Sequence, residues 1–271
     1  MTGLLYKAWA FLKRDFCIES GYKTSFLMRL AESMMLLVFF YFLGGLINSH
    51  TSAMLNRYGS SYFSFAMIGL AFARYFDLTL KMFSESIRLA QTTGCLEAML
   101  SSQTNCVTIV LFSSLYGLIS GAVQLCLILL AGAFIFGVNL SQMNVAATLL
   151  VVLLSITIFV AFGVLSAAAI VLLKKGDPIT WILGGFGSIL GGAYFPIDVM
   201  PAPLRNLSRV IPIRYSLDAL RLTMLKGYSV AMVKGPLITL AAIAVILLPL
   251  SLVLFDATIR KGRKEGTLMQ Y

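Results

Sequence analysis

The chain has 271 residues, of which 59% are hydrophobic and only 12% are charged, and its mean hydropathy is +0.91. This composition excludes an ordinary soluble domain, because uncharged runs long enough to cross a bilayer recur along the sequence. In a membrane protein the net charge of +10 bears on orientation and on anionic lipid. We therefore expect the lipid bilayer as a partner, and no nucleic acid.

Residues 1–25 are amphipathic. Apolar side chains recur at helical spacing, and basic side chains occupy the other face. A helix of this kind lies in the membrane interface and does not cross the bilayer. The apolar positions are Leu5, Ala8, Trp9, Leu12 and Phe16, and the basic ones are Lys7, Lys13 and Arg14.

Uncharged or nearly uncharged runs predict a six-span transmembrane domain over 26–256, and so an all-α integral membrane protein. No charged residue lies between Glu97 and Lys174, a run long enough for two spans and a hairpin. The predicted spans are 26–47, 60–80, 107–135, 145–172, 178–195 and 236–256.

The connections between these spans predict the orientation. Most basic residues fall on one side, which is therefore expected to be cytoplasmic. The long segment 196–235, on the other side, carries six basic residues and counts against this assignment. The short connections decide it, because Lys174 and Lys175 lie in one and 136–144 has no charge. We expect both termini in the cytoplasm, with 257–271 as a basic tail. The connections on the cytoplasmic side are 1–25, 81–106, 173–177 and 257–271.

Arg74 and Asp77 are charged residues within the second predicted span. They are three residues apart, so they share a helix face and can pair. One interpretation is a polar patch in a transport pathway. The other, which we favour because both residues precede Lys81 by less than two turns, is a structural pair near the cytoplasmic interface. Arg29 and Glu32, at the start of the first span, receive the same interpretation.

The long cytoplasmic connection contains a small apolar cluster. Gly94 allows a tight turn, and a short helix carrying Leu96, Glu97 and Leu100 then follows. A helix that exposes leucines and a carboxylate to the cytoplasm indicates a docking element for a partner. The alternative is a solvated loop with incidental apolar residues.

Four of the seven prolines lie within residues 196–212: Pro196, Pro201, Pro203 and Pro212. Proline interrupts helices, so the chain leaves regular spanning helix there. Two short amphipathic helices are predicted within 196–227, joined at Pro212. Interfacial helices that cover the ends of neighbouring spans are the favoured interpretation, and a lid over an exit path is the alternative.

The predicted faces of this helical pair follow from the apolar spacing. Asp218 is spaced to pair with Arg214 or Arg221, Ser216 is a candidate helix cap, and Lys226-Gly227 indicates a helix end. The first apolar face is Met200, Leu204, Leu207 and Ile211, and the second is Ile213, Leu217, Leu220 and Met224.

Catalytic and metal-binding chemistry is not indicated. His50 is the only histidine, and the four cysteines lack ligand-like spacing. Two Gly-x-x-x-Gly pairs allow close helix contacts, either within the chain, which we favour, or at a dimer seam for the second. The pairs are Gly117 with Gly121 and Gly187 with Gly191.

These stretches, in this order, resemble the permease subunits of ABC-2 type (type V) exporters over nearly the whole chain. GCLEAMLSS at 94–102 is similar to the family's Gly-x-Leu-Glu-x-Leu element, with Ser101-Ser102 in place of the usual Ser-Pro. The segment 191–221, GGAYFPIDVMPAPLRNLSRVIPIRYSLDALR, resembles the family's Phe-Pro…Leu-Pro…Leu-Pro-Leu…Arg signature. Met200-Pro201 and Ile211-Pro212-Ile213 stand in the corresponding places.

The resemblance implies a half-transporter. Two copies of the chain would form a pathway at their interface, each with one ATP-binding subunit against the cytoplasmic connection. The implied coupling helix covers about 85–100, with Arg88, Gly94, Leu96, Glu97 and Leu100. The residues implied at the outer gate and re-entrant helices are Tyr194, Phe195, Pro196, Pro201, Pro212 and Arg221.

The implied cargo is amphipathic or lipid-linked (a drug, lipid, glycolipid or polysaccharide), moved outward across a bacterial or archaeal cell membrane. The sequence contains no G-x-x-x-x-G-K-[ST] motif. ATP and Mg are therefore expected on the partner subunit, and this chain is expected to be non-catalytic. An ion-coupled secondary transporter using Asp77 is the alternative. A membrane enzyme acting through Asp198 or Asp218 ranks lower.

Overall fold

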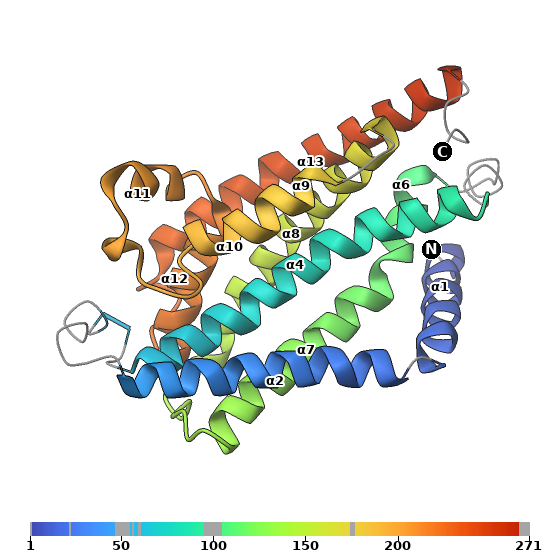
Figure 1. Cartoon of the computed structure of the whole chain (residues 1–271). Coiled ribbons are helices and arrows are strands. Elements are labelled where there is room, and N and C mark those ends of the chain that lie inside the picture. The colour runs from blue at the N-terminus through green and yellow to red at the C-terminus, as the bar shows by residue number, and fades with distance from the viewer. Residues whose placement is uncertain are drawn as a thin grey trace.

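The fold is that of a computed structural model, which describes residues 2–21, 23–46, 55, 57–58, 61–94, 105–173 and 177–265. These ranges contain helices and connections and no strand (Figure 1), which confirms the all-α membrane prediction. The long helices are α1 (Thr2–Ser20), α2 (Lys23–Leu46), α4 (Tyr62–Thr92), α7 (Leu115–Phe134), α8 (Val145–Leu173) and α13 (Lys234–Glu265).

Helix α4 lies at the centre of the bundle, where it packs against α2, α7, α8 and α12 (Figure 1). Phe65, Phe72 and Phe83 are fully buried along it. Small residues let neighbouring helices approach closely. A side chain at Gly163 of α8, for example, would overlap the ring of Phe83. Helix α8 also packs along α13.

The predicted third span is built from two helices, α6 (Cys106–Ser113) and α7, which together are long and apolar enough to cross a membrane. They meet at Ser114, whose hydroxyl donates to the carbonyl oxygen of Val110 at 3.1 Å. A serine bonded back in this way often bends a helix.

Five helical segments of the described chain are long and apolar enough to cross a membrane, whereas six were predicted. The fifth predicted span is a shorter apolar helix, Pro178–Leu190, made of α9 (Pro178–Thr180), a π-helical segment η1 (Trp181–Phe186) and α10 (Gly187–Leu190). At 1.5 Å per residue it is about 20 Å long, against a bilayer core of about 30 Å. It therefore ends inside the bundle, at a turn in which Gly192 has a φ of +77°.

Helix α4 is longer than the predicted second span. It continues to Thr92, so residues 85–92 of the expected coupling helix are its last turns. Gly94 has a φ of +69°, as its predicted turn requires. Residues 95–100 lie outside the described ranges.

The two ends of the bundle differ. Helix α1, the end of α4 and the end of α13 lie at one end, which we call the α1 end (Figure 1). The helical pair α11 (Ala202–Ser208) and α12 (Pro212–Leu225) lies at the other, the α12 end. The described parts of the predicted connections alternate between these two ends, as the sequence predicted.

Helix α1 lies across the α1 end instead of running along the bundle (Figure 1). It packs on α6 and α7 through ring contacts of Phe11 with Phe112 and of Phe16 with Tyr116. Leu5 and Trp9 stay exposed, as expected of an interfacial helix.

The two helices of the folded-back pair are present, and the predicted role of Ser216 is wrong. Helix α12 begins at Pro212, a favoured first position for proline, and ends at Leu225, capped by Lys226 and followed by Gly227 at a φ of +67°. Ser216 is not a cap. It lies buried inside α12 and accepts a 2.8 Å hydrogen bond from Ser155 of α8, because the proline starts the helix one turn earlier. The predicted apolar face of α12 is buried: Ile213, Leu217, Leu220 and Met224.

The Gly-x-x-x-Gly pairs pack within the chain, as we favoured. Gly117 lies against Met82, and Gly121 lies against Tyr75 of α4. In the second pair, Gly191 lies against Ile213 of α12.

Candidate functional site

One face of α4 carries a line of charges of alternating sign. The residues recur every three or four positions, so they lie one above another on the helix. Asp77 is the middle residue of α4, so the line begins deep in the bundle and runs towards the α1 end. The residues are Arg74, Asp77, Lys81, Glu85 and Arg88.

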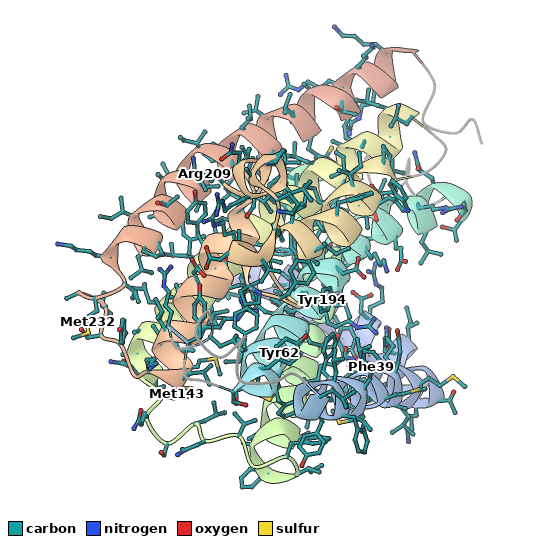
Figure 2. The ribbon with its side chains drawn as sticks, turned by 60° about the vertical axis from the view of Figure 1, so that its left-hand side comes forward. Phe39, Tyr62, Met143, Tyr194, Arg209 and Met232 are labelled. Atoms are coloured by element: carbon teal, nitrogen blue, oxygen red, sulfur yellow. The ribbon has the colours of Figure 1, made fainter. Side chains whose placement is uncertain are left out.

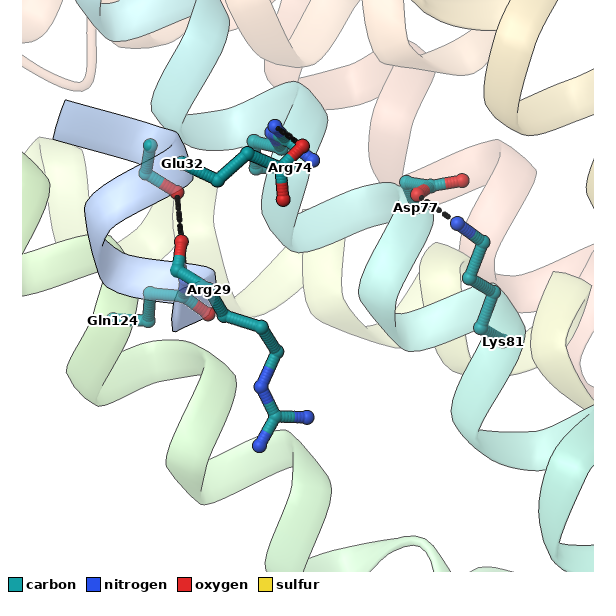
Figure 3. A network of polar contacts seen from close by, with 7 residues as sticks. Arg29, Glu32, Arg74, Asp77, Lys81 and Gln124 are labelled. Carbon is teal, nitrogen blue, oxygen red and sulfur yellow. Dashed lines mark hydrogen bonds and ion pairs between the residues drawn. The ribbon is translucent and has the colours of Figure 1, made fainter. Parts of the chain in front are cut away.

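The predicted pair of Arg74 with Asp77 is wrong. Arg74 forms an ion pair with Glu32 of α2, and Asp77 pairs with Lys81 at 2.8 Å (Figure 3). The spacing of Asp77 and Lys81 (i, i+4, acid first) is the favourable one on a helix. The Arg74 side chain instead turns to the neighbouring helix, whose position the sequence alone did not reveal.

A cavity of about 570 Å³ opens beside this charged face. On one wall stand Asp77, Lys81 and Glu85 of α4, and on the other Trp181 and Phe186. The two aromatic rings meet edge to face, with centroids 5.5 Å apart. The cavity therefore has charged side chains of α4 on one side and, on the other, two aromatic rings next to Asp177 and Thr180.

Asp77 also touches the π-helical segment. A Cβ atom at Gly184 would lie 2.5 Å from Oδ1 of Asp77. Glycine at this position lets the segment approach the charged face of α4. Single π turns occur often at functional sites.

A buried polar cluster fixes the start of the short helix. The Asp177 carboxylate accepts hydrogen bonds from the Thr180 backbone N–H at 3.0 Å and from the Ser166 hydroxyl at 2.5 Å. Asp177 thus caps α9 and ties it to α8.

The second cavity, of about 350 Å³, lies between α1, α2, α4 and α7. An ion pair joins Arg29 of α2 to Glu19 of α1 at 3.1 Å. The amide of Gln124 on α7 donates to the carbonyl oxygen of Arg29 at 3.3 Å (Figure 3). Polar contacts therefore join α2 to three other helices around this cavity.

At the α12 end, Arg221 is only 2% exposed. Its guanidinium donates to the carbonyl oxygens of Phe65 at 3.2 Å and of Gly192 and Ala193, each at 2.9 Å. The guanidinium also lies over the Phe65 ring, 3.4 Å from its centroid. A side chain at Gly69 would overlap the Ala193 oxygen, so the small residue makes room for this contact.

Asp218 does not form an ion pair with Arg214 or Arg221 in the described part of the chain. It accepts a hydrogen bond from the Tyr58 hydroxyl. Burial raises the pKa of Tyr58, and the nearby Asp218 charge raises it further. The phenol therefore stays protonated and keeps donating.

The expected gate residues lie around this Arg221 cluster. Tyr194 accepts, through its carbonyl oxygen, a 3.0 Å hydrogen bond from the Tyr62 hydroxyl (Figure 2), and its ring stacks on Phe40. Pro196 is buried and precedes the 3-10 turn η2 (Ile197–Val199), while Phe195 is half-buried. Pro201 precedes α11.

The expected coupling residues are described only in part. Arg88 is exposed on the last turns of α4, and Gly94 turns the chain after it. Leu96, Glu97 and Leu100 lie outside the described ranges.

Sequence reasoning missed several residues at these sites. Gln124 was detectable as a polar residue in an uncharged run, and Asp177 as an acid directly before Pro178. Tyr58, Gly69 and Gly184 gave no signal, because their roles depend on helices far away in the sequence.

These features define a multi-pass, all-helical membrane protein with charged cavities in its bundle and a folded-back helical pair at one end. The model of the ABC-2 type transporter family matches residues 6–225. The chain belongs to this family and is a permease subunit of an ABC transporter, which implies association with an ABC ATP-binding subunit. No curated protein matches the chain at a significant level.

Proposed function

We propose that the chain is the non-catalytic membrane half of an ATP-driven exporter, which pairs with a second permease chain and two ATP-binding subunits. Its cargo would be amphipathic or lipid-linked and would move outward. The observation that carries this proposal is the larger cavity, with Lys81 and Glu85 on one wall and Trp181 and Phe186 on the other. A molecule with a polar head and an apolar body matches both walls.

The central helix supplies a route for the driving force. Helix α4 runs without a break from Tyr62 to Thr92, past the cavity to the connection where the ATP-binding subunit would dock. At its other end the Phe65 carbonyl oxygen accepts from Arg221 of α12. A displacement of the docking connection would therefore reach both the cavity and the folded-back pair.

Residues 85–100 would receive this displacement, with Arg88 on the last turns of α4 and Leu96, Glu97 and Leu100 against the ATP-binding subunit. Tyr194, Phe195 and Pro196 would lie at the outer gate. ATP and Mg would be held by the partner subunit, in a cell membrane with both termini of this chain in the cytoplasm.

The test is co-purification with the candidate ATP-binding subunit in mild detergent, followed by an ATPase assay. We expect Leu96→Asp to weaken association about tenfold or more, because a charge at the centre of an interface costs roughly 2 kcal/mol. Val210→Asp is the matched control, since Val210 is an exposed apolar residue at the α12 end. If no ATP-binding subunit associates with the wild-type chain, or if Leu96→Asp behaves like the control, the proposal is wrong.

The ion-coupled alternative is less well supported. Asp77 is paired with Lys81 at 2.8 Å, whereas ion coupling needs a carboxylate that changes its charge or ligand during the cycle. ATP-driven transport that persists in Asp77→Asn would exclude it.

A further inference from the structure

The second cavity adjoins the larger one and shares Asp77, Lys81 and Glu85 with it. We call it the crevice and define it by its charged lining. Two of its ion pairs are shown in Figure 3. Uncharged polar side chains, among them Ser33, Ser120 and Gln124, complete the lining. The charged residues are Glu19, Arg29, Glu32, Arg74, Asp77, Lys81 and Glu85.

The crevice lies beside two segments that are long and apolar enough to cross a membrane. Arg29 and Glu32 belong to the spanning segment Phe26–Leu46, and Arg74 and Asp77 lie in the middle turns of α4. The paired side chains are not sealed inside the protein, since Arg74 is 33% and Glu32 is 62% exposed. Charges within spanning segments do not face hydrocarbon stably. The crevice is therefore suited to water or to a polar headgroup.

The charges in the crevice nearly balance. Three ion pairs join Arg29 to Glu19, Arg74 to Glu32 and Lys81 to Asp77. Glu85 makes no ion pair within the described ranges and remains as one extra carboxylate. A purely anionic group would meet the extra negative charge, whereas a group with both an ammonium and a phosphate can contact the extra carboxylate and the cations of the ion pairs.

We propose that the crevice binds the headgroup of a zwitterionic phospholipid from the leaflet at the α1 end. Its ammonium group would approach Glu85 and Glu32, and its phosphate would approach Arg29 and Lys81. The acyl chains would lie on exposed apolar side chains next to the crevice residues, including Met28 of α2 and Val123 of α7. This site adjoins the cargo cavity, with which it shares Asp77, Lys81 and Glu85, but lipid binding here does not require the proposed function.

The proposal predicts a lipid preference opposite to the one expected from the net charge of the chain. A chain of net charge +10 would generally favour anionic lipid. The crevice instead favours phosphatidylethanolamine over phosphatidylglycerol with the same acyl chains.

The experiment is native mass spectrometry of the purified full chain in an equimolar mixture of the two lipids. We expect the wild type to retain phosphatidylethanolamine over phosphatidylglycerol by about fivefold, the effect of one partly exposed charge contact. Glu85→Gln leaves the three ion pairs intact and should bring the ratio close to one. The double variant Glu32→Gln, Arg74→Gln should lose the retained lipid.

The matched control is Asp256→Asn with Arg260→Gln, which removes an exposed ion pair of 2.8 Å on α13, outside the crevice. It should bind lipid like the wild type. Preference for phosphatidylglycerol, an unchanged ratio in Glu85→Gln, or equal lipid loss in the control would each overturn the proposal. Lipid-free dimers of the wild type would also overturn it, because a second copy would then be the occupant.

Discussion

Arg221 of α12 and Ala193, in the turn after α10, are joined by a 2.9 Å hydrogen bond from the guanidinium to the carbonyl oxygen. The same guanidinium also holds Gly192 and Phe65. One buried cation therefore fixes three segments: the folded-back helix, the end of the short apolar helix and the central helix. Carbonyl dipoles, together with the Phe65 ring, surround this cation without an ion-pair partner in the described part of the chain.

Replacing Arg221 should loosen this junction. We expect Arg221→Met to destabilise the protein by about 2–4 kcal/mol, because buried carbonyl oxygens would lose their donors. Arg221→Lys should recover part of the loss. Unfolding in detergent measures the effect, with Arg209→Met as the control because Arg209 is exposed on the same folded-back segment. Equal stability of Arg221→Met and the control would contradict the role of this junction.

The contact of Gly184 with Asp77 predicts different effects at two adjacent glycines. In Gly184→Ala the new Cβ would lie 2.5 Å from Oδ1 of Asp77, whereas nothing lies within 4 Å of a Cβ at Gly185. We expect Gly184→Ala to cost about 1–3 kcal/mol by overpacking, and Gly185→Ala to be neutral or slightly stabilising.

A second substitution tests the cause of that loss. Asp77→Ala removes the carboxylate that the new methyl group meets, so it should relieve part of the cost of Gly184→Ala. Thermal unfolding of the two single variants and the double variant gives the interaction energy. Strict additivity would show that the strain lies elsewhere.

The hydrogen bond from Tyr58 to Asp218 predicts a pH dependence. Because burial and the Asp218 charge raise the pKa of Tyr58 in the folded state, the neutral phenol stabilises the fold. This contribution is fully present below the unfolded pKa of about 10 and is lost as the pH rises above it. The stability of the wild type should therefore fall above about pH 10 relative to Tyr58→Phe. Denaturant unfolding from pH 8 to 11 measures the difference, and parallel profiles would show that Tyr58 titrates as an exposed phenol.

The Asp177 cap predicts local loosening of the short apolar helix. Asp177→Ala should cost about 1–2 kcal/mol, typical of a lost N-cap, and hydrogen exchange should increase over Pro178–Leu190. Asp198→Ala is the control, because Asp198 is exposed in a 3-10 turn near the far end of this region. Unchanged exchange in Asp177→Ala would mean that packing against α8 and α4 holds the helix without the cap.

The sequence by itself predicted most of the helices and their order. A long uncharged run satisfies its backbone hydrogen bonds in a bilayer by forming a helix. The runs that form α2, α7, α8 and α13 could therefore be recognised in the sequence. Proline and glycine also act locally, which explains why the interruption at Pro212 and the turns at Gly94 and Gly227 were predicted correctly. The fifth predicted span corresponds to the shorter apolar helix Pro178–Leu190, because hydropathy does not show where a helix ends inside a bundle.

The tertiary structure decided which side chains meet. Arg74 and Asp77 are close on one helix, yet Arg74 pairs with Glu32 of α2, and Asp218 bonds to Tyr58 instead of to its helical neighbours. Spacing along a helix shows only which residues share a face, whereas the partner of a charged side chain depends on every opposite charge within its reach. That partner comes from whichever helix packs beside it, and this neighbour is fixed only when the whole bundle has assembled.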